Sequence, residues 1–501
     1  MEHIGSKTTL DNELPDSFKL LPGEKLLRPV INHEKRILSK QPSSLEQMSR
    51  LTRAKDSSEI GQFGPSLAAI ALEAADLENP QNTPKHLRLY EALFGRDSLR
   101  VAIDLVASYP NLARSTILEL ARYQGLELNI NREEELGKIV HEVRKNDDPI
   151  AQSLTAERGW DWPYYGSVDA TPEFIRTLTA YCQQSEENRG FLSEVYIDQH
   201  GNERQVAESL EMALSWIHRK LASNTEGLLE FKSVLPKGIE NQVWKDSWDA
   251  YHHSDGQMAN HDKGIASIEV QVTTYDALID AAELFEDILD NNDYAQYLRA
   301  EAAKLKKTIF DEFWCEDKGG YFVLGTDRDE SGKLRQLQIR TSNMGHTLNS
   351  RLLKGDEPAV VRMREAVIRQ ITSPELLNVS GIRTLASDEY RFRPESYHCG
   401  SVWLWDTHHI AKGARRLKYK EVANDIDKRI LHVIQATKMF PEYVKGDSSH
   451  IPTVNNQTII LWDEINQREN KVAQPPQEVQ AWSVGAILAT KIRAQRSQLE
   501  Q

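Results

Sequence analysis

The stretch Ile268–Phe313 reads IEVQVTTYDALIDAAELFEDILDNNDYAQYLRAEAAKLKKTIFDEF and is the clearest guide to the fold. Apolar residues recur in it with the i, i+3, i+4, i+7 spacing of one face of an α-helix. The pattern predicts two consecutive amphipathic helices, Ile268–Leu289 and Asp293–Phe313, joined by a short polar turn. Helices of this kind bury their apolar faces against one another.

The same periodicity recurs along most of the chain. It predicts further helices at Pro65–Leu77, Asp97–Ser108, Leu112–Tyr123, Pro172–Gln183, Gln205–Leu221, Asn343–Leu353, Pro358–Ile371, Val402–Leu417, Tyr419–Met439 and Val479–Ala494. Strand candidates are scarce, and the clearest is a hairpin that pairs Gly320–Leu324 with Gln336–Arg340 across the turn-rich stretch TDRDESGK. No fixed-period repeat of the solenoid kind occurs. We therefore expect an all-α fold whose helices wrap as an inner and an outer ring, with the functional loops at one rim.

Composition limits the class of protein. The 501 residues are 40% hydrophobic and 27% charged, which is typical of a globular chain. The net charge of −14, without a stripe of Lys and Arg, argues against nucleic acid and anionic membranes as partners. No apolar run approaches the ~20 residues of a membrane span, and no signal-peptide pattern is present. Three scattered cysteines, Cys182, Cys315 and Cys399, fit a reducing compartment, so we expect a cytoplasmic protein.

The domain organisation is predicted to be simple. Residues 1–64 are polar and weakly periodic and contain four prolines, which indicates an irregular N-terminal arm. Residues 65–495 are expected to form one helical catalytic domain. The oligomeric state is not indicated by the sequence.

Two loops ahead of predicted helices carry candidate sugar-binding residues. In FGRDSL, Arg96 and Asp97 offer a donor fork beside an acceptor for vicinal hydroxyls, although this motif taken alone favours a capping role for Asp97 or Ser98 at the following helix. In Gly159–Pro172 the rings of Trp160, Trp162 and Tyr165 crowd a short loop. Loops normally expose polar side chains, so these rings indicate a sugar platform.

Two further loops carry carboxylates suited to acid–base chemistry. In VWKDSWDA, Asp246 and Asp249 stand between two tryptophans, and on a helix they would share one face. An indole neighbour desolvates a carboxyl group and raises its pKa, as a general acid requires. The alternative is a solvated acidic loop in which Lys245 pairs with a carboxylate. Glu442, in FPEYV, is the best candidate for the second carboxylate that a glycosidase needs, the alternative being a surface acid.

Metal, nucleophile and cofactor chemistry is disfavoured. The pairs His252-His253 and His408-His409 are adjacent rather than spaced as zinc ligands. No GxSxG, HExxH, Walker or GxGxxG pattern occurs in a suitable context. We expect neither a metal nor a cofactor.

Taken together, the loops resemble the amylo-α-1,6-glucosidase domain of glycogen-debranching enzymes and its relatives in the six-hairpin glycosidase superfamily, which are (α/α)6 toroids. The resemblance covers Phe94–Ala486 and rests on ten motifs in the family's order: FGRDSL, GKIVHEVR, DWPYYGSVDATPEF, VWKDSWDA, IEVQ, TSNMGH, GIRTLAS, SYHCGSVWLWD, FPEYV and QAWSVGA.

The resemblance implies an inverting, exo-acting α-glycosidase that releases terminal glucose from an α-glucoside or oligosaccharide. It implies that Asp246 protonates the glycosidic oxygen and that Glu442 activates water, with Asp249 as a rival acid. It also implies substrate-binding roles for Arg96, Asp97, Trp160, Trp162, Tyr165, Trp244, Lys245, Glu269, Gln271, His398, Trp403 and Trp482.

Two departures from the family bear on the substrate. Only about ninety polar residues precede the first motif, so recognition of a glucan polymer is not expected. Val243 and Leu404-Trp405 stand where the family commonly has Gly and Pro-His, and the added indole favours a short glucoside. Related barrels hydrolyse glucosylglycerate or mannosylglycerate, whose carboxylate would suit the basic candidates Arg96, Lys138, Arg144 and Lys245. A non-catalytic carbohydrate-binding barrel, and a phosphorylase or epimerase on the same fold, are the remaining alternatives.

Overall fold

In the described part of the chain, helices dominate and strands are short. The computed structural model describes residues 92–499 except 145, 438, 455–456, 464–467, 475 and 477–479. The predicted arm (residues 1–64) and the predicted helix Pro65–Leu77 lie outside the described residues. No described helix combines the length and the apolar character that crossing a membrane requires.

Six helices pack against one another in a closed series, each against the next and the last against the first. In this order they are α5 (Gly95–Leu105), α8 (Ala170–Cys182), α11 (Ile268–Asp287), α13 (Asn343–His346), α15 (Leu404–Arg416) and α17 (Ala481–Leu499). Nearly every residue of α11 is buried, which is expected of a helix surrounded by protein on all sides. We refer to these six as the inner helices.

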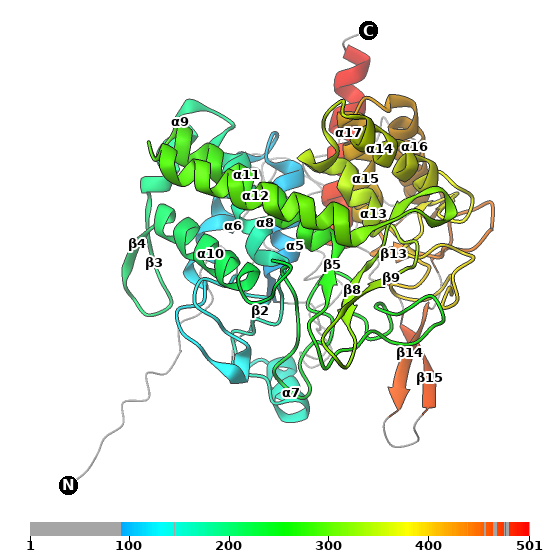
Figure 1. Ribbon diagram of the computed structural model, residues 1–501, viewed down its shortest axis with the longest axis horizontal. Coiled ribbons are helices and arrows are strands. Elements are labelled where there is room, and N and C mark those ends of the chain that lie inside the picture. The colour runs from blue at the N-terminus through cyan, green and yellow to red at the C-terminus, as the bar shows by residue number, and fades with distance from the viewer. Residues whose placement is uncertain are drawn as a thin grey trace, which may run out of the picture.

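A second set of helices covers the inner ones from outside. They are α6 (Pro110–Arg122), α10 (Val206–Leu221), α12 (Asn292–Phe313), α14 (Pro358–Ile371) and α16 (Lys420–Thr437). These pack on α5, α8, α11, α13 and α15, respectively. Along α12 the buried residues recur every three or four positions, from Ala295 to Phe313, as on a helix with one solvent-facing side. In Figure 1, the outer helix α12 lies beside the inner helix α11.

The remaining elements are small and lie in the connections. They are α7 (Pro149–Arg158), α9 (Glu186–Arg189), β3 (Val195–Ile197), β4 (Glu203–Gln205), β5 (Ala266–Ser267), β6 (Trp314–Cys315), β7 (Tyr321–Phe322), β8 (Gly325–Arg328), β9 (Leu334–Leu337), β10 (Leu377–Asn378) and β11 (Gly381–Ile382).

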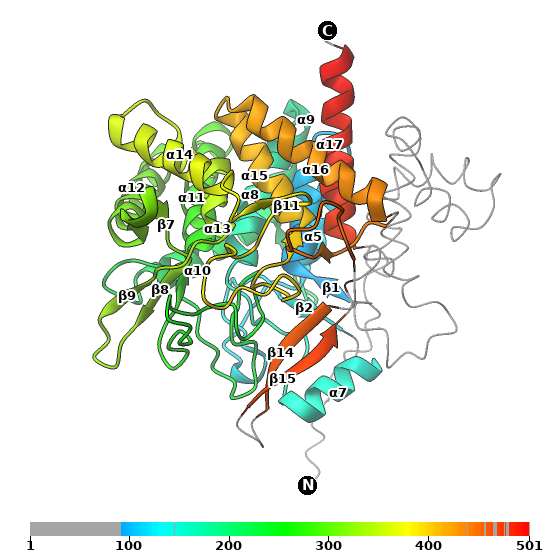
Figure 2. The same ribbon diagram turned by 90° about the vertical axis from the view of Figure 1, so that its right-hand side faces the viewer.

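Two pairs of very short strands connect distant segments at the beginnings of inner helices. β1 (Leu93–Phe94), just before α5, pairs with β2 (Glu142–Val143), and β12 (Val402–Trp403), just before α15, pairs with β13 (Tyr443–Val444). The first pairing needs Gly95, because a Cβ there would lie 2.0 Å from the Val140 carbonyl oxygen. In Figure 2, β1 and β2 lie below the start of α17.

Most predicted helix boundaries agree with the structure within a few residues, and Pro358–Ile371 coincides with α14. The single helix predicted at Asn343–Leu353 is wrong. The chain forms α13 and then two 3-10 turns, Thr347–Asn349 and Arg351–Leu353, because Ser350 between them is extended, with φ −122° and ψ 157°. The region Trp244–Asp249 is an irregular loop, so its two carboxylates do not share a helix face.

The predicted hairpin exists in a different register. β8 pairs with β9, and β7 pairs instead with β6. Asp327, expected in the turn, lies in β8 because its buried carboxylate is bonded by the Asn260 amide (2.9 Å) and the Arg335 guanidinium (2.6 Å). A longer hairpin, β14 (Gln457–Asp463) with β15 (Arg468–Gln474), was not predicted and extends from the body at the lower right of Figure 1.

Candidate active site

A cavity of about 120 Å³ lies at the N-terminal ends of the inner helices. One water molecule occupies ~10–15 Å³ of such a cavity, so this cavity has room for roughly ten waters. That number is close to the dozen or so non-hydrogen atoms of one hexose. Its lining comes from both halves of the chain: Phe94, Arg96, Asp97, His141, Trp244, Asp246, Tyr397, His398, Trp403, Glu442, Gln480, Ala481 and Trp482.

The fold explains why residues so far apart in sequence meet here. Arg96 and Asp97 lie in the first turn of α5, and Trp482 lies in the first turn of α17. The β12–β13 pairing brings Glu442, the residue before β13, beside the start of α15. Helix N-termini carry partial positive charge and favour nearby carboxylates, which suits a cavity that contains several.

Asp246 has the environment of a general acid. Its pKa is raised to about 7, chiefly because burial disfavours the charged carboxylate. Arg96 opposes this shift, with Nη2 3.4 Å from Asp246 Oδ2, whereas the charges of Asp97 and Asp169 reinforce it. The side chain keeps about a third of its surface exposed (33%), so it remains accessible from the cavity. Asp246 therefore carries a transferable proton near neutral pH.

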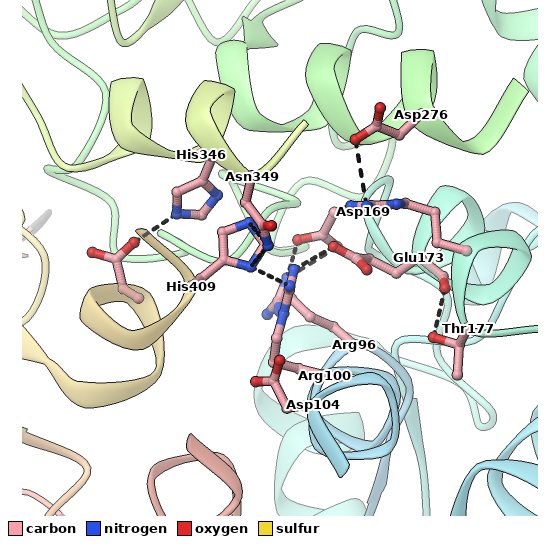
Figure 3. A network of polar contacts seen from close by, with 12 residues as sticks. Arg96, Arg100, Asp104, Asp169, Glu173, Thr177, Asp276, His346, Asn349 and His409 are labelled. Carbon is pink, nitrogen blue, oxygen red and sulfur yellow. Dashed lines mark hydrogen bonds and ion pairs between the residues drawn. The ribbon is translucent and has the colours of Figure 1, made fainter. Parts of the chain in front are cut away.

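Arg96 lies close to three carboxyl groups, those of Asp246, Asp169 and Asp97. Arg96 Nη1 donates to both oxygens of Asp169, at 3.0 and 3.2 Å, and Arg96 Nε lies 3.9 Å from Asp97. Figure 3 shows Arg96 on α5 directed at Asp169, with Arg100 and Glu173 forming the next such pair one helical turn further on. Burial raises the pKa of Asp97 to about 6, because it outweighs the opposing charge of Arg96 and is reinforced by the charge of Asp169.

Glu442 is buried, with 4% of its surface exposed, yet it lines the same cavity as Asp246. The Tyr397 hydroxyl donates a hydrogen bond of 2.5 Å to Glu442 Oε1. A hydrogen bond from a buried hydroxyl fixes the orientation of a carboxylate, as a base acting on a water molecule requires.

Aromatic rings form much of the cavity wall. Trp244 meets Trp403 edge to face at 5.9 Å, and Trp403 stacks on His398 at 5.1 Å. Trp482 stacks on Trp405 at 5.1 Å, behind the cavity. Rings packed in this way hold one another in place and present flat apolar faces with polar edges, which suit the faces of a sugar ring.

Several buried donors of the lining have no hydrogen-bond acceptor among the described residues: Arg96 Nε, Trp244 Nε1, His398 Nε2 and Trp482 Nε1. His398 is neutral, because burial and the charges of Lys245 and Arg96 hold its pKa well below the usual range. Its Nδ1 accepts from the Ser247 amide at 3.3 Å, which leaves the proton on Nε2. Buried donors normally find partners, so these groups are suited to bind substrate hydroxyls.

The aromatic residues predicted in the Gly159–Pro172 loop lie outside this lining. Trp160 stacks on Tyr164 at 4.0 Å, and Trp160 and Trp162 belong to a small separate apolar cluster with Ala151. The hydroxyl of Tyr165 donates to the Tyr123 carbonyl at 2.8 Å. Their side chains are engaged in packing.

Lys245, Glu269 and Gln271 are also outside the lining. Lys245 is 1% exposed and donates to the Thr384 carbonyl at 2.6 Å, and its ammonium lies 5.2 Å from the Trp244 ring centre. Glu269 accepts from Asn343 Nδ2 at 2.8 Å, and Gln271 bonds both backbone groups of Leu229 at 2.9 Å. Each stabilises the frame behind the cavity.

The rival acid, Asp249, does not line the cavity and is 5% exposed. Its backbone carbonyl accepts a hydrogen bond from Cys399 Sγ at 3.4 Å. This position makes Asp246 the better candidate for proton transfer to a substrate.

Sequence reasoning overlooked Tyr397, His141 and Asp169. The first two line the cavity and the third holds Arg96. Each lies inside a motif that the sequence singled out, but nothing local distinguishes a lining residue from its neighbours.

The two adjacent histidine pairs, His252-His253 and His408-His409, contact residues of the fold. His253 Nε2 lies 3.1 Å from Asp327, and His408 Nδ1 lies 2.9 Å from the Thr490 hydroxyl. Within the described ranges, no three His, Cys, Asp or Glu side chains group closely enough to hold a metal ion.

A known protein family matches a large part of the chain. The family described as "Mannosylglycerate hydrolase MGH1-like glycoside hydrolase domain" matches residues 184–456, more than half of the chain. The matched range includes Asp246 and Glu442 and leaves α5 and α17 outside it. No curated protein sequence matches the chain.

Proposed function

The chain belongs to the MGH1-like glycoside hydrolase family, and from this premise we propose that it removes one terminal hexose from a small α-glycoside with inversion, Asp246 acting as the acid and Glu442 as the base. The observation that carries the proposal is that both carboxylates line one cavity with room for about one sugar ring, and that the pKa of one of them is about 7.

In this reaction Asp246 gives its proton to the glycosidic oxygen as the bond from that oxygen to the anomeric carbon breaks. Glu442 takes a proton from a water molecule, whose oxygen attacks the anomeric carbon from the opposite face. An α-glycoside is then converted to a β-sugar and the free aglycone alcohol. Arg96 and Asp97 hold hydroxyls of the terminal sugar, and the ring faces and N–H groups of Trp244, Trp403 and Trp482 surround it.

The frame for this chemistry is proposed to be an (α/α)6 barrel. The closed series of six inner helices and the alternation of inner and outer helices support this arrangement. The residues of the site come from the N-terminal ends of inner helices and from loops beside them, as expected for a barrel that carries its site at one rim.

The lining favours a neutral sugar at the cleavage site. Of the basic residues considered for a charged aglycone, Lys138 bonds the Glu133 carbonyl at 3.1 Å, Arg144 pairs with Glu142, and Lys245 bonds Thr384. Arg96 is the one Lys or Arg in the described lining, and three carboxylates already share it. Release of glucose from a short α-glucoside is therefore the first candidate. Hydrolysis of a glycerate glycoside is the second, favoured by the family's description.

The test is an assay of hexose release from a panel of maltose, isomaltose, sucrose, glucosylglycerate and mannosylglycerate. Proton NMR should show the β-anomer of the released sugar first. Early α-anomer would contradict inversion, and a sugar phosphate formed only with added phosphate would indicate a phosphorylase.

Asp246→Asn and Glu442→Gln should each lower kcat at least ~10²-fold, because general acid–base assistance is worth that much. Asp249→Asn is the matched control and should keep most of the activity. Loss of activity in Asp249→Asn together with full activity in Asp246→Asn would move the acid to position 249.

A further inference from the structure

One short turn contacts both the candidate base and the loop that carries the candidate acid. It consists of residues 396–401, which lie just before β12 and belong to no helix or strand. His398 and Cys399, in its middle, are 2% and 1% exposed, so protein encloses this part of the turn. We refer to residues 396–401 as the bridging turn.

The bridging turn holds the base through Tyr397. The hydroxyl of Tyr397 donates a hydrogen bond of 2.5 Å to Glu442 Oε1. The ring of Tyr397 also meets the ring of Tyr443, the residue after Glu442, edge to face at 5.1 Å. A hydrogen bond and a ring contact therefore connect the turn to the side of the cavity that carries the base.

The next two residues of the turn hold the loop of the acid. His398 Nδ1 accepts hydrogen bonds from the amide of Ser247, at 3.3 Å, and from its hydroxyl, at 3.0 Å. Cys399 Sγ donates to the carbonyl of Asp249 at 3.4 Å. Ser247 directly follows Asp246 and does not line the cavity. These bonds therefore hold the loop beside the acid and lie outside the space for a substrate.

Contacts with its neighbours fix the turn itself. The Trp403 indole N–H donates to the Tyr397 carbonyl at 2.8 Å, and the Ser401 hydroxyl donates to the same oxygen at 2.6 Å. A Cβ on Gly400 would lie 2.3 Å from the Arg393 carbonyl oxygen, so the chain can pass here only with glycine. The side chains of the turn therefore keep fixed positions relative to one another.

We propose that the bridging turn sets the separation of Asp246 and Glu442, with His398 and Ser247 as the positioning residues on the side of the acid. This inference rests on the proposed function. An inverting glycosidase needs its two carboxyl groups ~6.5–9.5 Å apart, so that a water molecule fits beside the sugar. A misplacement of about 1 Å can lower the rate about 10²-fold. A single turn that bonds both sides limits such a misplacement.

Two substitutions of His398 separate positioning from substrate binding. Glutamine places an amide N–H near the position of Nε2 and has no acceptor at Nδ1, whereas asparagine places its amide oxygen near Nδ1 and has no donor at Nε2. His398→Gln should therefore lower kcat about tenfold or more with little change in KM. His398→Asn should mainly raise KM. Equal losses of kcat in the two variants would overturn the proposal, because the loss would then come from the donor to the substrate.

The pH dependence of kcat/KM gives a second measurement on the same variants. Burial is the main cause of the raised pKa of Asp246, so a loosened loop that exposes this side chain lowers its pKa. The fall of kcat/KM at high pH should therefore move toward acid in His398→Gln and stay in place in His398→Asn.

Ser247 allows a test outside the cavity lining. Ser247→Ala removes the hydroxyl that bonds His398 and should lower kcat about three- to tenfold without a change in KM. Ser247→Thr keeps a hydroxyl and should restore most of kcat. Ser254→Ala is the matched control, because Ser254 is exposed and does not line the cavity. Wild-type kcat and an unmoved pH profile in both Ser247→Ala and His398→Gln would overturn the proposal.

Crystal structures of the wild-type and His398→Gln chains test the same point without a substrate. The separation of the carboxyl groups of Asp246 and Glu442 should differ between them by about 1 Å or more. An unchanged separation would overturn the role of the bridging turn, even in a chain that hydrolyses glycosides. A wild-type chain that hydrolyses none of the panel would overturn the proposed function, and the two crystal structures would still decide the role of the turn.

Discussion

The substitution Asp97→Asn tests how the proton is retained on Asp246. Burial is the main cause of the raised pKa of Asp246, Arg96 lowers it, and the negative charges of Asp97 and Asp169 raise it further. Asparagine keeps the size of Asp97 and removes its charge. The pKa of Asp246 should therefore fall below about 7.

The size of the shift follows from the shared arginine. Asp246 Oδ2 lies 3.4 Å from Arg96 Nη2, and Asp97 Oδ2 lies 3.9 Å from Arg96 Nε. Both carboxylates contact one planar guanidinium, so they lie within about 10 Å of each other. At ~10 Å two unit charges repel by about 0.4 kcal/mol in water and by about 1.7 kcal/mol at an effective dielectric constant of ~20. With about 1.4 kcal/mol per pKa unit, the limits are about 0.3 and 1.2 units.

The assay is the pH dependence of kcat/KM for the best substrate of the panel. The acid must be protonated, so kcat/KM falls as pH rises through the pKa of Asp246. In Asp97→Asn this basic limb should move about 0.3–1.2 pH units toward acid. The pKa of Asp97 itself is about 6, so its charge is present in the wild-type protein over the limb being measured. The maximal kcat/KM should also fall, because Asp97 is proposed to hold sugar hydroxyls. The quantity to compare between the two proteins is therefore the pH at which the basic limb lies.

Asp249→Asn is the control for this measurement, because the charge of Asp249 is not among the main influences on the pKa of Asp246, unlike the charges of Arg96, Asp97 and Asp169. Its basic limb should coincide with that of the wild-type protein. A limb that stays in place in Asp97→Asn, or moves toward higher pH, would refute the account of the raised pKa.

Two further predictions concern the catalytic pair. Tyr397→Phe removes the hydroxyl that bonds Glu442, so kcat should fall about tenfold or more with little change in KM, and an unchanged kcat would show that this bond does not orient the base. Asp246→Asn should stabilise the protein more at pH 8 than at pH 5. The pKa of Asp246 is raised from 3.8 to about 7 in the folded state. The contribution of Asp246 to the free energy of unfolding is therefore complete below pH ~4 and is lost as the pH rises to about 7. Asparagine does not titrate, so the variant does not lose this stability. Melting temperatures of both proteins at the two pH values measure this, and a difference that is the same at both would contradict it.

The helices were predictable because their signal is local. The periodicity of Ile268–Phe313 and Pro358–Ile371 gave helices whose observed limits agree with it closely, because the buried face of a helix repeats at fixed spacing. Prediction failed where a distant contact overrides the local pattern. Asp327 has the character of a turn residue but lies in a strand, because Arg335, Asn260 and His253 satisfy its carboxylate there.

The candidate site divides in the same way. Composition and order of motifs were sufficient to select Asp246 and Glu442, whose meeting in one cavity is what the proposal required. They were not sufficient to separate Trp244, Trp403 and Trp482, which line that cavity, from Trp160 and Trp162, which pack elsewhere. An indole in a loop looks the same in sequence whether its face meets a cavity or another side chain.

By itself, the sequence determined the helical class and was sufficient to single out the candidate loops and the two carboxylates of the proposed mechanism, because spacing and residue type are properties of neighbours along the chain. Only the tertiary structure decided which side of each loop faces the cavity, why Asp246 keeps a proton near pH 7, and that one turn contacts both Glu442 and the loop of Asp246. The physical reason is that burial and electrostatic interaction depend on distances through space, and these distances are set by how the helices pack.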